Sequence, residues 1–314
     1  MGRLQKLKTA RSAVFLIITA LIWGVAFVAQ SVATELIGPF TFNGTRCLIG
    51  GIILLPVIAY SDAKKKREGT YVKMTRNDWR TLLIGGVLCG ICLCVASNLQ
   101  QLGINDNEAG KAGFITALYI VIVPIIGIFT KKKVRPVIWI CVAVAMVGMY
   151  FLCVSESFAF SKSDAFLFAG AFVFSLHIIV IDRFSPLTDG IKLSCIQFFV
   201  CAFISLIGMF IFEKPHIDDI TAAYIPLLYA GIMSCGVAYT LQIIGQKGLN
   251  PTVASLILSL ESVFSALAGW AILNETLSAK ELFGCALIFA AIITAQIPFK
   301  RREKAKSLRN PNDV

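Results

Sequence analysis

Residues 12–29 have the sequence SAVFLIITALIWGVAFVA and contain no charged side chain. A helix rises about 1.5 Å per residue, so a helix through this stretch nearly matches a bilayer hydrocarbon core about 30 Å thick. A membrane β-strand would span only about ten residues and would alternate in polarity, whereas this stretch is apolar on all sides. The stretch therefore predicts a transmembrane helix.

Similar apolar stretches recur along the whole chain of 314 residues, of which 57% are hydrophobic and 15% charged. An average soluble domain is about a quarter charged, so this composition excludes an ordinary soluble globule. Ten spans are predicted, at about 13–33, 40–60, 81–103, 109–130, 134–153, 165–182, 191–212, 223–246, 252–272 and 280–298.

The basic residues before the first span resemble a signal peptide, but the apolar run is too long and no cleavage site follows. We expect the first helix to be retained.

The positions of the 29 basic residues indicate the topology. With a cytoplasmic N-terminus, nearly all of them fall in inner segments, mainly 3–11, 64–80, 131–135 and 300–309. This asymmetry follows the positive-inside rule, so both termini are expected in the cytoplasm. The protein is expected to be a multi-pass protein of the cell (plasma) membrane. The natural partners of these loops are anionic lipid headgroups, and nucleic-acid binding is not expected. Whether the chain forms a homodimer is left open by the sequence.

The two halves of the chain align with each other weakly but in order. The alignment of 13–153 with 165–298 pairs Gly86 with Gly231, Gln101 with Gln246, Gly103 with Gly248, Asn105 with Asn250, and AGFI at 112–115 with ASLI at 254–257. Because each half has five spans, the second half enters the bilayer from the opposite face. We predict an all-α integral membrane protein with ten transmembrane helices in two inverted five-helix repeats, between a cytoplasmic tail at 1–12 and a basic cytoplasmic tail at 299–314.

Capping residues mark several of the predicted helix starts. Asn250 followed by Pro251 is typical of an N-cap before a proline in the first turn. Ser278 and Glu281 have the spacing of a capping box. Ser185 followed by Pro186 suggests a similar start for the seventh span.

Several motifs, in order along nearly the whole chain, resemble those of one known family. They are WGVAFVA at 23–29, Arg46 in the second span, AGFITALY at 112–119 followed by Pro124, the loop KKK at 131–133, LSLESVF at 258–264, LNETL at 273–277, and Gly284. Together they resemble the EamA family of the drug/metabolite transporter superfamily. Ser262 stands where that family commonly has proline, and Asn274 where it commonly has glycine.

The resemblance implies a ten-helix secondary transporter with a central cavity. Such a protein moves small metabolites, amino acids or related compounds, across the cell membrane, and export by alternating access is the expectation. The alternative is a non-transporting membrane protein, such as a receptor or a flippase-like subunit. A small-molecule substrate is thus the expected partner.

Ionisable groups within the spans are the sharpest site candidates, because a charge near the bilayer centre is costly unless it is paired or wetted. Glu261 lies close to the middle of the ninth span. It could bind a proton or face a substrate amine, or it could be packed and hydrogen-bonded to hydroxyls of neighbouring helices. Its counterpart in the repeat is Tyr119.

His177 and Arg46 are the other ionisable candidates. His177 could relay protons or touch substrate, or simply pack against another helix. Arg46 could reach the outer interface, pair with Glu35 or Glu108, or bind a substrate carboxylate. Its repeat counterpart, Gln197, is uncharged.

Neutral polar and aromatic side chains complete the candidate set. The outer half of the third span contains the polar residues Ser97, Asn98, Gln100 and Gln101. The inner half of the eighth contains Tyr239, Thr240, Gln242 and Gln246. They are candidate gate or wall groups, with interhelical hydrogen bonding as the competing role. Trp23, in mid-span, is a candidate aromatic wall.

Neither an enzyme, a cofactor nor a metal site is expected. The chain has only two histidines and no paired carboxylates within spans. Cys89, Cys92 and Cys94 have ligand-like spacing, but no His or acidic partner is near, and buried thiols usually pack as small apolar groups.

Overall fold

The structure is a computed structural model that describes residues 3–104, 109–129, 135–153, 161–272, 276 and 278–296. Helices account for nearly all of this part of the chain, which contains no strand. The Lys131–Lys133 loop, Asn105, Glu108, the stretch 273–275 and the tail 299–314 lie outside the described residues. The predicted all-α class is confirmed for the described ranges.

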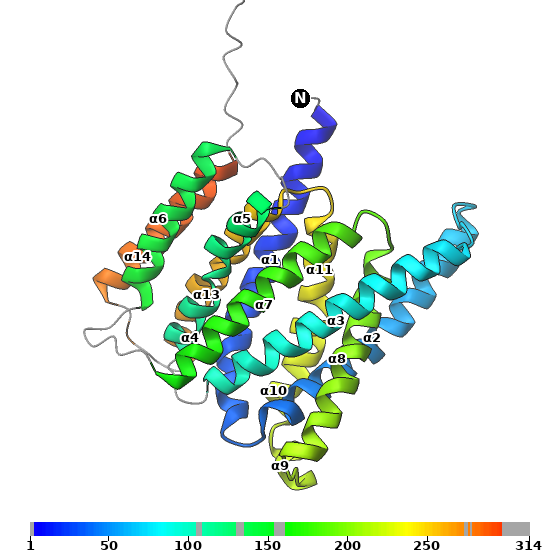
Figure 1. Cartoon of the computed structure of the whole chain (residues 1–314), viewed down its shortest axis with the longest axis horizontal. Coiled ribbons are helices and arrows are strands. Elements are labelled where there is room, and N and C mark those ends of the chain that lie inside the picture. The colour runs from blue at the N-terminus through cyan, green and yellow to red at the C-terminus, as the bar shows by residue number, and fades with distance from the viewer. Residues whose placement is uncertain are drawn as a thin grey trace, which may run out of the picture.

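The helices follow one another with short connections (Figure 1). The first half contains α1 (Arg3–Thr34), α2 (Pro39–Arg67), α3 (Arg76–Ile104), α4 (Ala109–Thr116), α5 (Tyr119–Phe129) and α6 (Pro136–Cys153). The second half contains α7 (Lys162–Phe184), α8 (Gly190–Phe212), α9 (Ile217–Ala222), α10 (Tyr224–Leu228), the π-helix η1 (Tyr229–Tyr239), α11 (Thr240–Gln246), α12 (Pro251–Leu258), α13 (Leu260–Ile272) and α14 (Ala279–Gln296).

Eight stretches of the described chain are long and apolar enough to cross a membrane. They are Thr9–Thr34, Pro39–Arg67, Arg76–Ile104, Ala112–Phe129, Lys162–Phe184, Gly190–Phe212, Tyr224–Gln246 and Pro251–Ile272. These stretches match predicted spans one to four and six to nine. The predicted fifth and tenth spans coincide with α6 and α14, each 18 residues long, which lie side by side (Figure 1).

The structure adds detail to the predicted spans and corrects one predicted helix start. The first helix begins at Arg3, well before residue 13, and the predicted fourth, eighth and ninth spans are not single α-helices. The start expected at Ser185 is wrong, because the N-cap of α8 is Asp189, whose carboxylate accepts from the backbone N–H groups of Ile191 and Lys192. An aspartate cap four residues downstream of Ser185 outcompetes the Ser-Pro pair.

The other two predicted caps are confirmed. The side chain of Asn250 accepts a hydrogen bond from the Thr252 backbone N–H, with Pro251 in the first turn of α12. Ser278 and Glu281 form a reciprocal capping box, in which Glu281 Oε2 accepts from the Ser278 N–H and Ser278 Oγ accepts from the Glu281 N–H. Both caps satisfy backbone donors at helix starts.

Glycines bring two pairs of helices into close contact. A β-carbon at Gly24 of α1 would lie only 2.7 Å from the backbone carbonyl carbon of Phe264 on α13. A β-carbon at Gly148 of α6 would lie 2.8 Å from the carbonyl oxygen of Gly284 on α14. Packing of this kind drives helix association in lipid, where no hydrophobic force acts between helices.

The helices α2 and α8 are antiparallel and are fastened to each other at one end through Glu213. This residue, which follows the last turn of α8, accepts from the backbone N–H groups of Phe40 and Thr41, both at 2.8 Å, and from the Thr41 hydroxyl at 2.6 Å. Its carboxylate thereby satisfies free donors at the positive N-terminus of α2.

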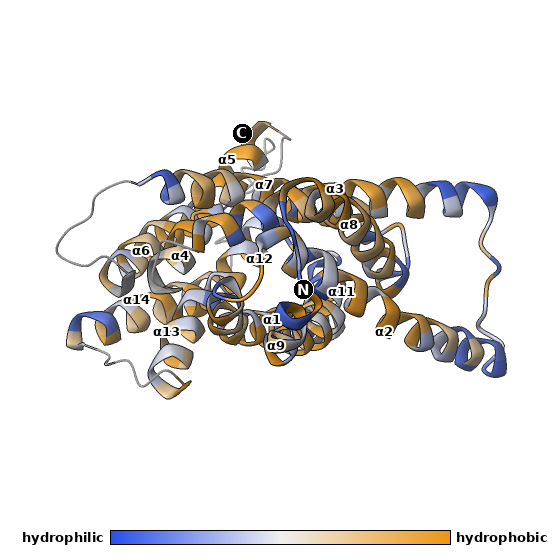
Figure 2. Cartoon of the chain, turned by 90° about the horizontal axis from the view of Figure 1, so that it is seen from below, coloured by the Kyte–Doolittle hydropathy of each residue, from blue (hydrophilic) through white to orange (hydrophobic). Residues whose placement is uncertain are grey.

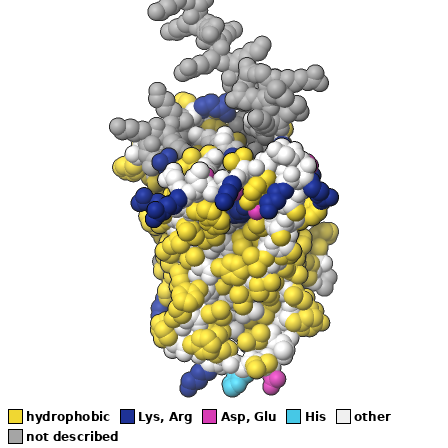
Figure 3. All heavy atoms as spheres, turned by 90° about the vertical axis from the view of Figure 1, so that its right-hand side faces the viewer, with side chains coloured by type: hydrophobic (Ala, Val, Ile, Leu, Met, Phe, Trp, Pro, Cys, Tyr) yellow, Lys and Arg dark blue, Asp and Glu magenta, His cyan; other side chains and the backbone are white. Residues whose placement is uncertain are grey.

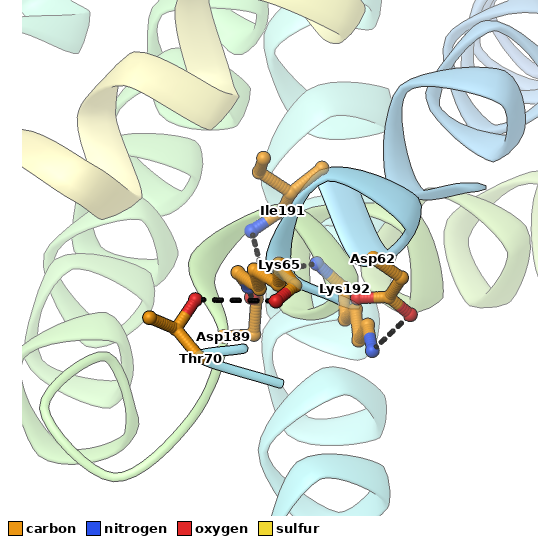
Figure 4. Close-up of polar contacts among 6 residues, drawn as sticks. All are labelled: Asp62, Lys65, Thr70, Asp189, Ile191 and Lys192. Carbon is orange, nitrogen blue, oxygen red and sulfur yellow. Dashed lines mark hydrogen bonds and ion pairs between the residues drawn. The ribbon is translucent and has the colours of Figure 1, made fainter. Parts of the chain in front are cut away.

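At the opposite end, two ion pairs join α2 to the start of α8 (Figure 4). Lys65 Nζ lies 2.8 Å from Asp189 Oδ2, and Lys192 Nζ lies 2.8 Å from Asp62 Oδ2. Burial alone would raise the pKa of Asp189, but the Lys65 ammonium and the capped backbone N–H groups keep it below its ordinary value of 3.8. The α2–α8 pair is therefore tied at both ends.

The outer surface is apolar along the helices and polar at their ends (Figure 2). Phe203, Phe210 and Ile140 are 68%, 77% and 64% exposed. Figure 3 shows a broad apolar face below a band of Lys and Arg side chains near one end. Lipid is the solvent that covers such a surface.

Candidate functional site

A small cavity of about 30 Å³ lies among the helices. It is lined by seven of the nine predicted site residues, which come from α1, α2, α5, α7, η1, α11 and α13: Trp23, Arg46, Tyr119, His177, Tyr239, Gln242 and Glu261. This volume holds only one or two water molecules. In this conformation the cavity is too small for any larger molecule.

Helix interruptions position Tyr119 and Glu261. Tyr119 is the first residue of α5, after a break at 117–118, and Glu261 is the second residue of α13, after a break at Ser259. The Tyr119 hydroxyl donates a 2.9 Å hydrogen bond to Glu261 Oε1. The two residues that the internal alignment pairs are therefore in direct contact, and both line the cavity.

Serine side chains around the second interruption donate to carbonyl groups of their own segment. Ser259 Oγ donates to the Leu256 carbonyl at 2.8 Å, and Ser262 Oγ donates to the Ser259 carbonyl at 2.6 Å. These hydroxyls serve their own segment, so the hydroxyl that reaches Glu261 is that of Tyr119 on a neighbouring helix. Irregular backbone at membrane depth is tolerated where it is buried in protein or lines a cavity.

Arg46 lines the cavity and is only 2% exposed. Its Nε donates a 2.8 Å hydrogen bond to Asn43 Oδ1, and its guanidinium lies 5.3 Å from the centre of the Phe42 ring. The expected reach to the outer interface and the pairing with exposed Glu35 are wrong, because the side chain points inward. No carboxylate of the described residues forms an ion pair with it, and a buried charge is costly without a counter-charge.

Tyr239 is the centre of an aromatic group in the cavity wall. Its ring centroid lies 4.6 Å from that of Trp23, 5.9 Å from that of Phe198 and 6.0 Å from that of His177. Phe27 and Phe174 also line the cavity. The wall thus offers flat apolar surface to a ligand.

Three fully buried polar atoms in the cavity wall have no hydrogen-bond partner within the described chain. The indole Nε1 of Trp23 is an unused donor, and the amide oxygens Oε1 of Gln30 and Gln242 are unused acceptors. Gln30 and Gln242 are 4% and 1% exposed. Buried polar groups without partners are unfavourable, so water or a ligand is their natural complement.

His177 is fixed by a contact between the two helices α7 and α8. Its Nε2 lies 3.1 Å from Gln197 Oε1, and its ring is 1% exposed. Gln197 is the residue that the internal alignment pairs with Arg46. His177 therefore packs against another helix and also lines the cavity, and its role in proton relay or substrate contact stays a prediction.

Asn98 and Gln101 do not line the cavity. Asn98 Nδ2 donates to the Cys94 carbonyl at 2.8 Å and to Ser205 Oγ at 3.0 Å, and Gln101 Nε2 donates to the Gln30 carbonyl at 3.2 Å. The bond to Cys94 lies within α3, whereas the bonds to Ser205 and Gln30 join α3 to α8 and α1, which is the competing role named above.

Three polar wall residues were absent from the predicted gate, wall and coupling groups: Gln30, Thr116 and Ser234. Gln100 Nε2 donates to Thr116 Oγ1 at 3.3 Å, so these two residues bridge α3 and α4. Gln30 is an uncharged amide within an apolar span, and this signal was available in the sequence. Ser234 and Thr116 are small polar residues that recur throughout the spans and give no such signal.

The described residues contain no group of three or more His, Cys, Asp or Glu side chains that could hold a metal ion. Thiols nevertheless meet where α2 packs on α8, since Cys47 Sγ donates to Cys201 Sγ at 3.4 Å. Both thiols are free and fully buried.

The family comparison agrees with the fold and with the motifs around the cavity. The model of the EamA-like transporter family matches residues 10–154 and again residues 161–295. The chain belongs to the EamA-like transporter family. Membership of this family indicates a membrane transporter and suggests that the protein is not an enzyme.

Two curated relatives of this EamA-like protein cover most of the chain. An uncharacterized transporter of Archaeoglobus fulgidus is 30% identical over 288 residues, which cover 90% of this chain and 84% of that protein. The uncharacterized transporter YoaV of Bacillus subtilis is 24% identical over 294 residues, which cover 92% of this chain and 97% of that protein. Neither name states a substrate.

One solved crystal structure, described only as that of a protein, has a similar fold. Its TM-score is 0.72 at 17% sequence identity, and the match covers 91% of this chain and 96% of that one. At this identity the likeness supports the shared fold alone.

Proposed function

We propose that this EamA-like protein is a secondary carrier that moves a small carboxylate-bearing metabolite, such as an amino acid or a related compound, by alternating access. The observation that carries the proposal is the central cavity, where Arg46 is buried without a carboxylate partner from the described residues. A substrate carboxylate supplies the counter-charge in two parallel hydrogen bonds, the geometry that a guanidinium favours.

The remaining free groups of the cavity fit the other parts of such a substrate. The unused oxygens of Gln30 and Gln242 accept from an ammonium or amide group, and Trp23 Nε1 adds a donor. The rings of Trp23, Phe174 and Tyr239 suit an apolar side chain. Ligand pockets usually measure about 300–1,000 Å³, so the present cavity corresponds to an occluded state that widens for loading.

Two inverted repeats of five spans supply the alternating motion in this proposal. The helix interruptions before Tyr119 and Glu261 fall at corresponding places in the internal alignment. The family model also matches the two halves separately. Alternating access then follows from exchange of the conformations of the two repeats.

The helix contacts agree with such an exchange. In the internal alignment α3 corresponds to η1 and α11, and α7 corresponds to α1. The contact of α3 with α7 therefore corresponds to the contact of α1 with η1 and α11. In the same way, the contact of α3 with α8 corresponds to the contact of α2 with η1. In the contacting pairs α2–α8 and α6–α14, each helix is the repeat counterpart of its partner, so exchanging the two repeats gives the same pair. With α6 and α14 counted as spans, the chain crosses the membrane ten times.

Glu261 and Tyr119 are the proposed coupling pair. A carboxyl group that is 4% exposed at the break of a membrane helix is stable when protonated, and it is able to exchange its proton when the cavity opens to water. Proton-coupled export is therefore the mode of transport in this proposal. The basic band of Figure 3 faces the cytoplasm of the plasma membrane, following the positive-inside rule.

Untargeted metabolite analysis of cells and medium tests the carrier. Strains that express the unmodified protein, Glu261→Gln or no protein are compared at matched membrane abundance. We expect one or a few carboxylate-bearing metabolites to leave the cells only with the unmodified protein. If no metabolite differs from the strain without the protein, a carrier for export is excluded, and a receptor or flippase-like role takes its place.

A further inference from the structure

A second hollow lies near the ends of α2, α3 and α8, outside the central cavity, and has a volume of about 360 Å³. It forms because α2 and α3 each pack along α8 but make few contacts with each other. The connection 68–75 between them bends at Gly69, whose φ of +67° suits glycine. A space of this size is typical of ligand sites in proteins.

The floor of this hollow is apolar. Ile58 of α2, Leu82 of α3 and Ile196 of α8 line it, together with Met74 of the connection. Leu82 is fully buried beneath it. A soluble anion such as phosphate gains nothing from this floor, whereas an acyl chain does.

The rim of the hollow is aromatic and positively charged. Trp79 and Tyr71 line it and are 49% and 37% exposed, as is usual for aromatic residues at the level of lipid headgroups. Lys192 is neutralised by its 2.8 Å ion pair with Asp62, as Figure 4 shows. Lys73 is exposed and forms no ion pair with the described residues, so it leaves the lining with one net positive charge.

The surface around the hollow is also basic at one level and apolar below it. On the face of the molecule that Figure 3 shows, Lys and Arg side chains form a band directly above an apolar surface. If the apolar surface lies in the hydrocarbon core of a bilayer, the band lies at the level of the lipid headgroups. Basic residues at this level attract anionic lipid.

We infer that this hollow is a binding site for one anionic phospholipid, whose headgroup lies at Lys73 beside Trp79 and Tyr71 and whose acyl chain lies between α2 and α3 on α8. The site is independent of the transported substrate. A lipid there fills the space that the two helices leave and lies beside the Asp62–Lys192 ion pair.

Trp79 makes the site directly measurable, because brominated acyl chains quench the fluorescence of a nearby indole. The full-length protein is titrated with brominated phosphatidylglycerol or brominated phosphatidylcholine in mixed micelles. The signal of Trp79 is isolated as the difference between the unmodified protein and Trp79→Phe. We expect phosphatidylglycerol to quench Trp79 at a lower mole fraction than phosphatidylcholine.

Charge variants assign the preference to the hollow. Lys73→Gln should reduce the preference for phosphatidylglycerol about fivefold, which corresponds to roughly 1 kcal/mol per basic residue near an anionic membrane surface. Lys214→Gln, an exposed lysine that follows the opposite end of α8, should leave it unchanged. Added glycerol 1-phosphate should not relieve the quenching.

Three results would overturn the inference. Equal quenching of Trp79 by both lipids would remove the anionic preference, and no quenching that depends on Trp79 would remove the site. Competition by glycerol 1-phosphate would show that the hollow binds a soluble phosphate ester instead of a lipid. Each of these outcomes is independent of whether the protein transports a metabolite.

Discussion

Arg46 shows how the three-dimensional structure resolves a question that the sequence leaves open. A lone arginine in an apolar span can reach the interface, pair with an acid or face a cavity, and linear spacing does not distinguish these environments. In the folded chain, Asn43 and Phe42, three and four positions earlier on the same helix, hold the side chain beside the central cavity. The guanidinium is therefore available to bind a ligand.

Replacing Arg46 tests this assignment. Arg46→Gln should lower transport by at least tenfold, because it removes a charge-assisted bidentate contact worth about 1.5–3 kcal/mol. Arg46→Lys should restore only part of the flux, since an ammonium cannot form the same pair of parallel bonds. Initial rates at matched membrane abundance measure both.

Arg80→Gln is the control for this pair of variants, because Arg80 is exposed in the first turns of α3. It should transport normally. Equal flux in Arg46→Gln and the unmodified protein would contradict a substrate role for Arg46.

Replacing Glu261 and Tyr119 separately distinguishes coupling from packing. Glu261→Gln keeps the volume and a hydrogen-bonding group but cannot titrate, so the remaining flux should no longer depend on pH. Tyr119→Phe removes only the hydroxyl that donates to Glu261, so a pH dependence should persist with an altered midpoint. Flux measured between pH 5 and pH 8 tests the pair, and an unchanged pH profile in Glu261→Gln would reduce this residue to a structural one.

Seven of the nine predicted site residues line the cavity. The sequence did not tell which members of a polar run face inward, because that depends on rotation about the helix axis. Gln100 and Gln101 are adjacent in an apolar helix, and only the first lines the cavity. Successive residues on a helix point about 100° apart, so a polar run alone does not tell which member faces inward. Gln30 was missed because one amide near the end of a span resembles an interfacial residue.

At the scale of the helices, the interruptions before Tyr119 and Glu261 are the main feature that sequence reasoning did not predict. Neither break contains glycine or proline: Ala117 and Leu118 form one, and Ser259 forms the other. Local propensity therefore gives no warning. Tertiary contacts, among them the Tyr119–Glu261 hydrogen bond, compensate for the lost helical bonds.

Gly24 is expected to control the approach of α1 to α13. Gly24→Ala forces a methyl group against the backbone of Phe264 and should destabilise the protein by about 1–3 kcal/mol, the usual cost of overpacking. Gly127→Ala is the matched control within α5, since nothing lies within 4 Å of a β-carbon there. Thermal unfolding in detergent compares the two variants, and a Gly24→Ala protein as stable as Gly127→Ala would contradict the close contact.

The Lys65–Asp189 pair predicts a small dependence of stability on acid. The pKa of Asp189 is lower in the folded protein than its ordinary value of 3.8, so its stabilising effect is complete above that value and is lost as pH falls through the folded pKa. Asp189→Asn keeps the N-cap but loses the ion pair, and it should cost less than about 1 kcal/mol because the pair is partly exposed.

Unfolding of the unmodified protein and of Asp189→Asn between pH 7 and pH 3 measures this effect. The stability difference between them should close as the pH falls. Asp189→Ala, which also loses the cap, should remain less stable than Asp189→Asn throughout. A stability difference that widens in acid would contradict the ion pair.

At the scale of the whole molecule, composition and apolar length predicted more than any single motif did. Apolar length predicted the spans, since lipid requires each crossing segment to satisfy its own backbone. The internal alignment predicted which residues correspond, and two of them, Tyr119 and Glu261, meet in the structure. The α2–α8 ties could not be predicted, because they join residues far apart in the sequence through side chains at helix ends.

The most direct test of the carrier proposal is counterflow in reconstituted vesicles. Vesicles are loaded with the unlabelled metabolite that the expression experiment identifies, diluted into a trace of the labelled compound, and followed over time. A site that opens to each face in turn predicts transient accumulation of label above equilibrium in the unmodified protein and none in Arg46→Gln. Label that only equilibrates, at a rate that does not saturate, would contradict alternating access and indicate a pore.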